Sequence, residues 1–153
     1  MRGLVALALA AISTFVLFGC ERWELDRKME ELCKKDGGIK VYETVTLSAS
    51  EFVTLWKYVI TAKSLEDYYG PSYRYVSKKE VLLGKDARLD KGEGQLDRIY
   101  QAIYRRSDNR LLGEQVAYLR GGGDYFTFGF QPSSASCPRL DRDLAQKIFI
   151  QGK

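Results

Sequence analysis

The sequence contains no histidine, and this absence limits the chemistry that its side chains can perform. Serine–histidine–aspartate and cysteine–histidine catalysis both use an imidazole as the general base, and many metal sites use one as a ligand. A reaction would therefore have to depend on carboxylates, on lysine or on a serine–lysine pair. No Ser-x-x-Lys motif stands in an informative setting, so the sequence favours no nucleophilic mechanism.

Two acidic residues stand apart from basic neighbours and are the best candidates for a pair of catalytic carboxylates. Glu114 lies in the second half of a predicted hairpin, and Asp124 follows Gly121-Gly122-Gly123. Glycosidases hold two such groups about 5 to 9.5 Å apart. The competing interpretation, which the sequence favours, is a solvated strand residue and a turn aspartate. The glycine run lacks the Gly-Lys-Ser/Thr ending of a phosphate-binding loop, so it indicates a turn.

Tyrosines around the turn signal Gly70-Pro71 are the most distinctive candidates for binding. Tyrosine and arginine are enriched at interfaces because they supply a large contact area and a polar tip, and aromatic rings also stack on sugars and flat ligands. The alternative is that they are ordinary strand residues, of which half pack on the core. The candidate binding surface comprises Tyr68, Tyr69, Tyr73, Arg74, Tyr75, Asp124 and Tyr125.

The first nineteen residues differ from the rest of the chain and indicate an export signal. Arg2 supplies a positive charge, and residues 4–18 then carry no charge at all. A positive start followed by an apolar run is typical of secretory signals. This run is shorter than the roughly 20 residues that a membrane-spanning helix needs, which makes a permanent signal anchor the less favoured alternative.

The run ends in Leu17-Phe18-Gly19-Cys20, which resembles the lipobox of bacterial lipoproteins. In that family the cysteine is diacylated on sulfur and the signal is cut before it. Leu17 and Gly19 match the family pattern, whereas Phe18 stands where a small residue is more common. The resemblance covers residues 1–20 and implies a signal peptide over residues 1–19, lipid on Cys20 and a place on a membrane of the cell envelope. Since no aspartate follows the cysteine, resemblance to enterobacterial sorting favours the outer membrane, facing the periplasm.

Assigning lipid to Cys20 leaves Cys33 and Cys137 together in an oxidising compartment, where disulfides persist. A bridge between them would close a loop of about a hundred residues and stabilise the fold by roughly 4 to 5 kcal/mol in the chain-entropy model. Two separate thiols are the alternative. With only two thiols left and no histidine, we expect neither a metal nor another cofactor.

Length and charge suit one domain that does not bind nucleic acid. Removal of residues 1–19 from the 153-residue chain leaves 134, so we expect residues 20–153 to form a single periplasm-facing domain. The full chain has 24 basic and 20 acidic residues. They are interleaved without a long block of like charge, which gives nucleic acid no basic surface.

Periodicity predicts the elements that would position these residues. An amphipathic helix is expected over residues 21–35, with acids early and lysines late. Ser48 with Glu51 forms a capping-box pattern ahead of a short helix through Val59. The predicted strands are 39–47, 73–83, 96–106, 111–120 and a returning 125–130, with loops over 85–94 and 132–138 and a last helix over 141–149. The expected fold is α+β: an antiparallel sheet of four or five strands with an N-terminal and a C-terminal helix packed on it.

Together these features predict a non-enzymatic envelope lipoprotein, held to the membrane through Cys20, that acts as an interaction or ligand-binding module. An inhibitor or immunity-type protein that meets an envelope protein or a glycan is one specific form of it. One alternative is a small carboxylate-based hydrolase acting on peptidoglycan or glycan. Another is a structural subunit of an envelope assembly, which predicts a large exposed apolar patch.

Overall fold

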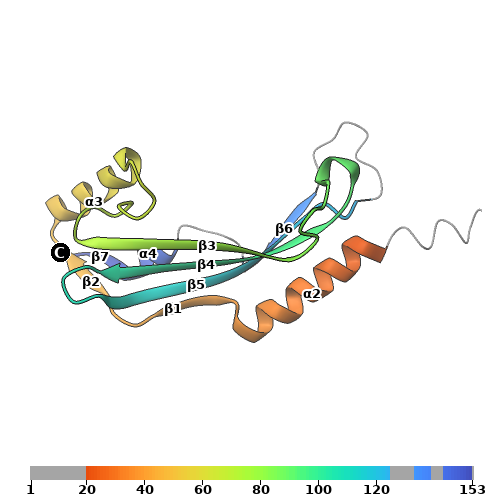
Figure 1. The fold of residues 1–153 in the computed structure, drawn as a ribbon. Helices are drawn as coiled ribbons and strands as arrows, with labels where there is room; N and C mark the ends of the chain where they lie inside the picture. The colour runs from red at the N-terminus through yellow and green to blue at the C-terminus, as the bar shows by residue number, and fades with distance from the viewer. Residues whose placement is uncertain (1–19, 125–132, 139–142, 153) are drawn as a thin grey trace, which may run out of the picture.

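A computed structural model of the chain describes residues 20–124, 133–138 and 143–152. Its main sheet has five strands, all paired antiparallel (Figure 1). The strands run in the order β1 (Gly38–Val41), β5 (Arg110–Gly121), β4 (Gln95–Arg105) and β3 (Tyr73–Leu83), while β6 (Ser134–Cys137) pairs with the other end of β5. Helices from both ends of the chain pack on this sheet, which confirms the predicted fold class.

The long hairpin of β4 and β5 forms the centre of the sheet. Its register runs from Gln95 opposite Gly121 to Arg105 opposite Arg110, and Asn109 adopts a positive φ of 54° in the turn. Asparagine tolerates that conformation, which suits the predicted turn composition. Because side chains alternate along a strand, each face of the hairpin is packed by different elements.

Helix α2 (Cys20–Asp36) covers one face of the hairpin, here named the α2 face. Leu25 and Met29 of the helix pack there with Leu96, Val116 and Tyr118. A disulfide between Cys33 and Cys137 joins the same helix to β6. The predicted helix and the predicted disulfide are both confirmed.

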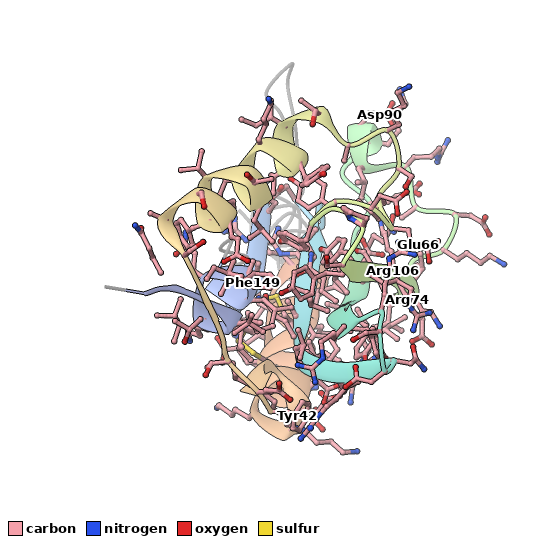
Figure 2. All side chains as sticks on the ribbon, turned by 90° about the vertical axis from the view of Figure 1, so that its left-hand side faces the viewer. Tyr42, Glu66, Arg74, Asp90, Arg106 and Phe149 are labelled. Carbon is pink, nitrogen blue, oxygen red and sulfur yellow. A yellow bond between two sulfur atoms is a disulfide. The ribbon has the colours of Figure 1, made fainter. Side chains whose placement is uncertain are left out.

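The opposite face, here named the α3 face, is covered by helix α3 (Ala49–Thr61) and helix α4 (Asp143–Ile148). The capping box of α3 is formed as predicted, with the Ser48 N–H donating to Glu51 Oε2 at 2.8 Å. Phe149 lies in the interior on this side of the molecule (Figure 2). Helices α2 and α3 thus lie on opposite faces and toward opposite ends of the sheet (Figure 1).

The prediction of one strand over residues 39–47 is wrong. The chain forms β1 and a separate strand β2 (Val45–Leu47), which pairs in parallel with β7 (Phe149–Gln151) outside the main sheet. The backbone N–H groups of Tyr42 and Glu43 both donate to the carbonyl of Leu112, at 2.8 and 3.0 Å. Two donors converge there because the β4–β5 register shifts beside Leu112, and this turns the chain out of the sheet.

Two further predictions near the C-terminus need correction. Residues 132–138 are not a loop throughout, since Ser134–Cys137 form β6 and pair with Tyr118 to Gly121. The last helix ends at Ile148 instead of 149, because Phe149 is 1 % exposed and begins β7 opposite Val45. The predicted strand 125–130 and Tyr125 lie outside the described residues. The loop over 85–94 is confirmed apart from one 3-10 turn, η1 (Leu89–Lys91).

Candidate binding site

A cavity of about 330 Å³ lies on the α3 face of the sheet. Strands β4 and β5 form its floor, α3 and residues 62–72 form one wall, and α4 forms the other. The lining side chains are mostly apolar or aromatic: Trp56, Val59, Leu65, Tyr68, Tyr69, Tyr75, Ile99, Gln101, Gln115, Leu144 and Ala145. We name this cavity the aromatic pocket.

The floor of the aromatic pocket carries two glutamines. Gln101 of β4 lies directly opposite Gln115 of β5 in the strand register, so both side chains project from the same face. Gln115 is only 1 % exposed, and among the described residues its Oε1 has no hydrogen-bond partner. A buried acceptor that is left unpaired costs about 1–3 kcal/mol. The pocket floor therefore holds a buried acceptor that no group of the described residues satisfies.

Tyrosine rings form much of the aromatic pocket's wall and pack against one another. Tyr69 meets Tyr68 and Tyr75 edge-on, with ring centroids 5.2 Å and 5.6 Å apart. Trp56 adds a further edge-on contact with Tyr69, with ring centroids 6.5 Å apart. Edge-to-face pairs stabilise a fixed ring arrangement beyond the area they bury.

Hydrogen bonds fasten residues 62–72, which carry part of this wall, to the edge of the sheet. The Tyr75 N–H donates to the Glu66 carbonyl at 3.0 Å. Arg106 donates to Asp67 Oδ1 at 2.5 Å and to the Tyr73 carbonyl at 3.0 Å. Glu66 and Arg106 accordingly lie on the same side of the molecule (Figure 2). The wall is therefore preformed by bonds that do not involve a ligand.

The aromatic pocket is electrically neutral as far as the described residues define it. None of the side chains that line it is an acid, a lysine or an arginine. Burial raises the pKa of Tyr75, against a smaller opposite effect of its hydrogen bond with Ser77, so this phenol stays protonated at neutral pH. An isolated charge would be costly to bury in such a site, so the pocket suits uncharged groups.

The structure divides the tyrosine group that the sequence singled out. Tyr68, Tyr69 and Tyr75 line the aromatic pocket, whereas the ring of Tyr73 packs on Phe149, 4.7 Å between centroids. Arg74 lies on the α2 face, where its guanidinium stacks 4.7 Å from the centre of the Tyr104 ring. Tyr73 and Tyr75 share one face of β3 and pack, like Tyr68, against a core cluster that includes Tyr69, in keeping with the alternative interpretation that these are ordinary core-packing residues.

The two candidate catalytic acids do not come together. Glu114 lies on the α2 face, accepting hydrogen bonds from the hydroxyls of Tyr42 at 2.7 Å and Tyr100 at 3.0 Å. The bond to Glu114 raises the pKa of Tyr42. Asp124 lies beyond Gly121, the last residue of β5. Gly121 is seven positions along the strand from Glu114, which corresponds to roughly 23 Å.

Asp124 has a structural role at the end of the sheet. It accepts hydrogen bonds from the Ser133 N–H at 2.7 Å and the Ser133 hydroxyl at 2.8 Å, and Arg22 lies 3.2 Å away. Burial alone would raise its pKa, but the Ser133 bonds and the Arg22 charge outweigh that effect and lower it. Asp124 therefore lies far from the aromatic pocket and fastens two segments of the chain together.

The glycine run ends strand β5: Gly121 is the last residue of the strand, and Gly122 and Gly123 follow outside any helix or strand. Gly122 and Gly123 have φ values of 69° and 80°, which disfavour other residues. A Cβ on Gly122 would lie 2.2 Å from the Glu93 carbonyl oxygen, and one on Gly123 would lie 3.0 Å from the Arg22 Cα. The glycines thus allow neighbouring backbone to approach closely. The described residues also contain no group of three or more side chains arranged to hold a metal ion.

Sequence reasoning missed the residues that make the pocket unusual. Gln101 interrupts an apolar alternation between Ile99 and Ile103 on β4, and this was the available signal. Gln115 gives no comparable signal, because its pairing with β4 becomes visible only in the register. Trp56 and Val59 were expected on a helix, without any indication that they would face a cavity.

Comparisons with known proteins assign no relative to this chain. No protein-family model matches it, and neither a curated protein nor a solved structure is significantly similar to it. Within the described residues, no helix is both long enough and apolar enough to cross a membrane. The aromatic pocket and the sequence of the N-terminal region are therefore the observations from which a function can be argued.

Proposed function

We propose that this chain is a lipid-anchored lipoprotein of the cell envelope whose folded domain is a non-enzymatic binding module, with the aromatic pocket as its binding site. The observation that carries the binding role is the Oε1 of Gln115, which has no partner among the described residues and is buried in the floor of a cavity walled by aromatic rings. Ligand sites combine apolar walls with a few convergent polar groups in this way.

The neutral lining defines the kind of group that the pocket binds. Because no charged side chain of the described residues faces it, a charged ligand group would lose its hydration without gaining a counter-ion. The ligand group is therefore uncharged and mostly apolar. The preformed wall favours binding because little conformational entropy is lost when the group enters.

The anchor lies at one end of the sheet, and the floor of the pocket lies near the middle of the sheet. Glu21, in the first turn of α2, accepts a hydrogen bond from the Gly94 N–H at 3.1 Å, and Arg22 contacts Asp124, so Cys20 lies at this end. Gln115 is six residues along β5 from Gly121, about 20 Å in an extended strand. Lipid on Cys20 would thus hold one end of the domain at the membrane and leave the pocket farther out.

The hydrolase alternative has less support. Its two candidate acids, Glu114 and Asp124, are separated along β5 and are each engaged by other side chains. Among the described residues, no acid lines the aromatic pocket. A sheet-based pocket with tyrosines and without an acidic cleft is the arrangement expected of a binder.

Lipid anchoring is tested with a Cys20→Ala variant expressed in a bacterial host. We expect the wild-type chain to be cut before Cys20, to incorporate labelled fatty acid and to fractionate with membranes. The variant should lose the label and the processed form. A variant that stays membrane-bound and is processed to the same size would contradict the lipoprotein assignment.

The binding site is tested with N-phenyl-1-naphthylamine, an uncharged aromatic probe that fluoresces in apolar sites. Val59 lines the pocket, so Val59→Trp should fill it and reduce probe binding at least about tenfold. Val53 lies on the same helix but is 69 % exposed, so Val53→Trp is a matched control that should bind like the wild type. Equal binding by all three proteins, or none by the wild type, would contradict the pocket assignment.

A further inference from the structure

The floor of the aromatic pocket also restricts which chemical groups a bound ligand carries. We infer that the pocket selects a flat, uncharged ring system bearing a hydrogen-bond donor, and that Gln115 is the residue that selects it. This inference rests on the proposed function, because it specifies the ligand of the same site. It concerns the ring and its N–H or O–H group, whether a free small molecule or a larger ligand presents them.

The requirement for a donor follows from Gln115. Its side chain is 1 % exposed, so bulk water does not reach it freely, and Oε1 has no partner among the described residues. A ligand N–H would reach this buried oxygen once the Gln115 side chain turns toward the cavity, and the bond would then remove the cost of the unpaired acceptor. A ligand that offers only acceptors would place its oxygen against the amide oxygen and leave both unpaired. The floor therefore discriminates by hydrogen-bond type as well as by polarity.

The requirement for a flat ring follows from the walls. Trp56, Tyr68 and Tyr75 come from three different segments and present aromatic rings to one cavity. Aromatic rings favour offset-stacked or edge-on contacts with another ring, which adds to the gain from buried area. At about 330 Å³ the cavity lies at the small end of the usual range for ligand sites, so it suits one bicyclic ring better than a large ligand.

The requirement for neutrality removes two classes of flat donor. A protonated amine or a guanidinium would find no carboxylate among the described lining residues, and a carboxylic acid would find no cation among them. Either would have to give up its charge or its hydration. An indole meets all three requirements, since it is planar and uncharged and has one N–H donor without a competing acceptor.

The experiment compares indole with 1-methylindole, which has the same ring system but no donor. Both compounds compete for bound N-phenyl-1-naphthylamine on the full chain purified in detergent. We expect the wild type to bind indole about tenfold more tightly than 1-methylindole, as one hydrogen bond to a buried acceptor allows. Gln115→Met keeps the length of the side chain and removes its amide, so it should bind the two compounds within about twofold.

Because every titration uses the same micelles, partition of the compounds into detergent affects all variants equally. It therefore cancels when the affinities of the variants are compared. Gln151→Met is the matched control: it removes the amide of an exposed glutamine of β7 that does not line the pocket, and it should keep the preference for indole. Circular dichroism and the thermal midpoint show whether each variant folds. If Gln115→Met fails to fold, indole and 1-methylindole titrated against wild-type chain labelled with ¹⁵N at glutamine provide the test, since only indole should shift the Gln115 side-chain amide resonances strongly.

The outcomes separate this inference from the proposed function. Equal binding of the two indoles by the wild type would overturn the donor requirement while leaving the pocket a binding site. A preference that persists in Gln115→Met would overturn the role of Gln115. Failure of the wild type to bind indole, 1-methylindole or the fluorescent probe would overturn both the pocket assignment and the inference that depends on it.

Discussion

Cys33 of α2 and Cys137 of β6 are bonded to each other, although they lie 104 positions apart in the chain. The bond links the helix that begins at Cys20 to a short strand at the edge of β5. It lies beside the apolar cluster in which Leu25 and Met29 pack on the sheet. The covalent link therefore joins the helix nearest the proposed lipid to the sheet that carries the aromatic pocket.

Loss of this disulfide should reduce stability without changing the fold. For Cys33→Ser/Cys137→Ser we expect the free energy of unfolding to fall by about 4 kcal/mol, because the unfolded chain regains the entropy of a loop of about a hundred residues. Urea unfolding of the oxidised wild type and of the double variant measures the difference. Wild-type protein kept in reductant is the control and should unfold like the variant. Equal midpoints for all three samples would show that the bond contributes little.

Arg120 should be far more important for stability than its neighbour Arg22. The Arg120 side chain is 2 % exposed and donates to Asp26 at 2.8 Å, to the Gly122 carbonyl at 2.8 Å and to the Ser133 hydroxyl at 2.6 Å. Arg120→Met leaves these acceptors without their donor and should cost about 3 kcal/mol.

Arg22→Met is the control for that measurement. Arg22 also pairs with Asp26 and Asp124, but its side chain is 55 % exposed, so its loss should cost less than about 1 kcal/mol. Urea unfolding at neutral pH provides both values. The unfolding free energy should depend on urea concentration with the same slope in both variants as in the wild type. A smaller loss for Arg120→Met than for Arg22→Met would contradict the assigned importance of burial.

Acid should weaken the turn that ends β1. The hydrogen bond from Arg105, at 2.5 Å, lowers the pKa of Glu43 below its ordinary value near 4.5, and Arg110 lies 2.9 Å away. A carboxyl group whose pKa is lower in the folded state stabilises the fold above its unfolded pKa. That stabilisation is lost as the pH falls through the folded pKa.

Glu43→Gln should therefore unfold with a flatter pH dependence below about pH 4.5 than the wild type. The free energy of urea unfolding, measured in steps from about pH 7 to about pH 3, checks this. Glu80 is an exposed residue of β3, and Glu80→Gln is the control that should keep the acid dependence of the wild type. Identical curves for wild type and Glu43→Gln would rule out a contribution from the Glu43–Arg105 pair.

Lipid on Cys20 should bring Trp23 to the membrane surface. Trp23 is 67 % exposed and follows Cys20 by three residues, about 4.5 Å along a helix axis. Tryptophan favours the interface between water and lipid. In vesicles containing brominated lipid, we expect strong quenching of Trp23 fluorescence in Trp56→Phe, the variant in which Trp23 is the remaining tryptophan.

The reciprocal variant, Trp23→Phe, is the control, because Trp56 lines the aromatic pocket on α3. Its fluorescence should be quenched little. Membrane-bound protein with an unquenched Trp23 would contradict this orientation while leaving lipid anchoring intact. Protein that does not associate with the vesicles at all would contradict the anchoring itself.

Local patterns in the sequence sufficed for most elements of this fold. Apolar spacing and charge order predicted α2, and Ser48 with Glu51 predicted the start of α3. Alternation on both sides of a turn predicted the β4–β5 hairpin. The absence of histidine and the count of cysteines also limited the chemistry and suggested the bond between Cys33 and Cys137. All of these depend on residues close in the chain, or on counting residue types.

Contacts between distant segments decided the rest. The break at Tyr42 arises from the Leu112 carbonyl, seventy positions away in the chain, and the switch from helix to strand at Phe149 arises from pairing with Val45. Gln101 and Gln115 share a floor because of the strand register, and only the packing of α3 and α4 above them encloses a cavity. The sequence by itself determined the charge and predicted most of the elements and a pairing of the two thiols that remain once Cys20 carries lipid. The tertiary structure decided which tyrosines face the pocket and left the Gln115 Oε1 without a partner among the described residues, because register and burial depend on which strands and helices meet.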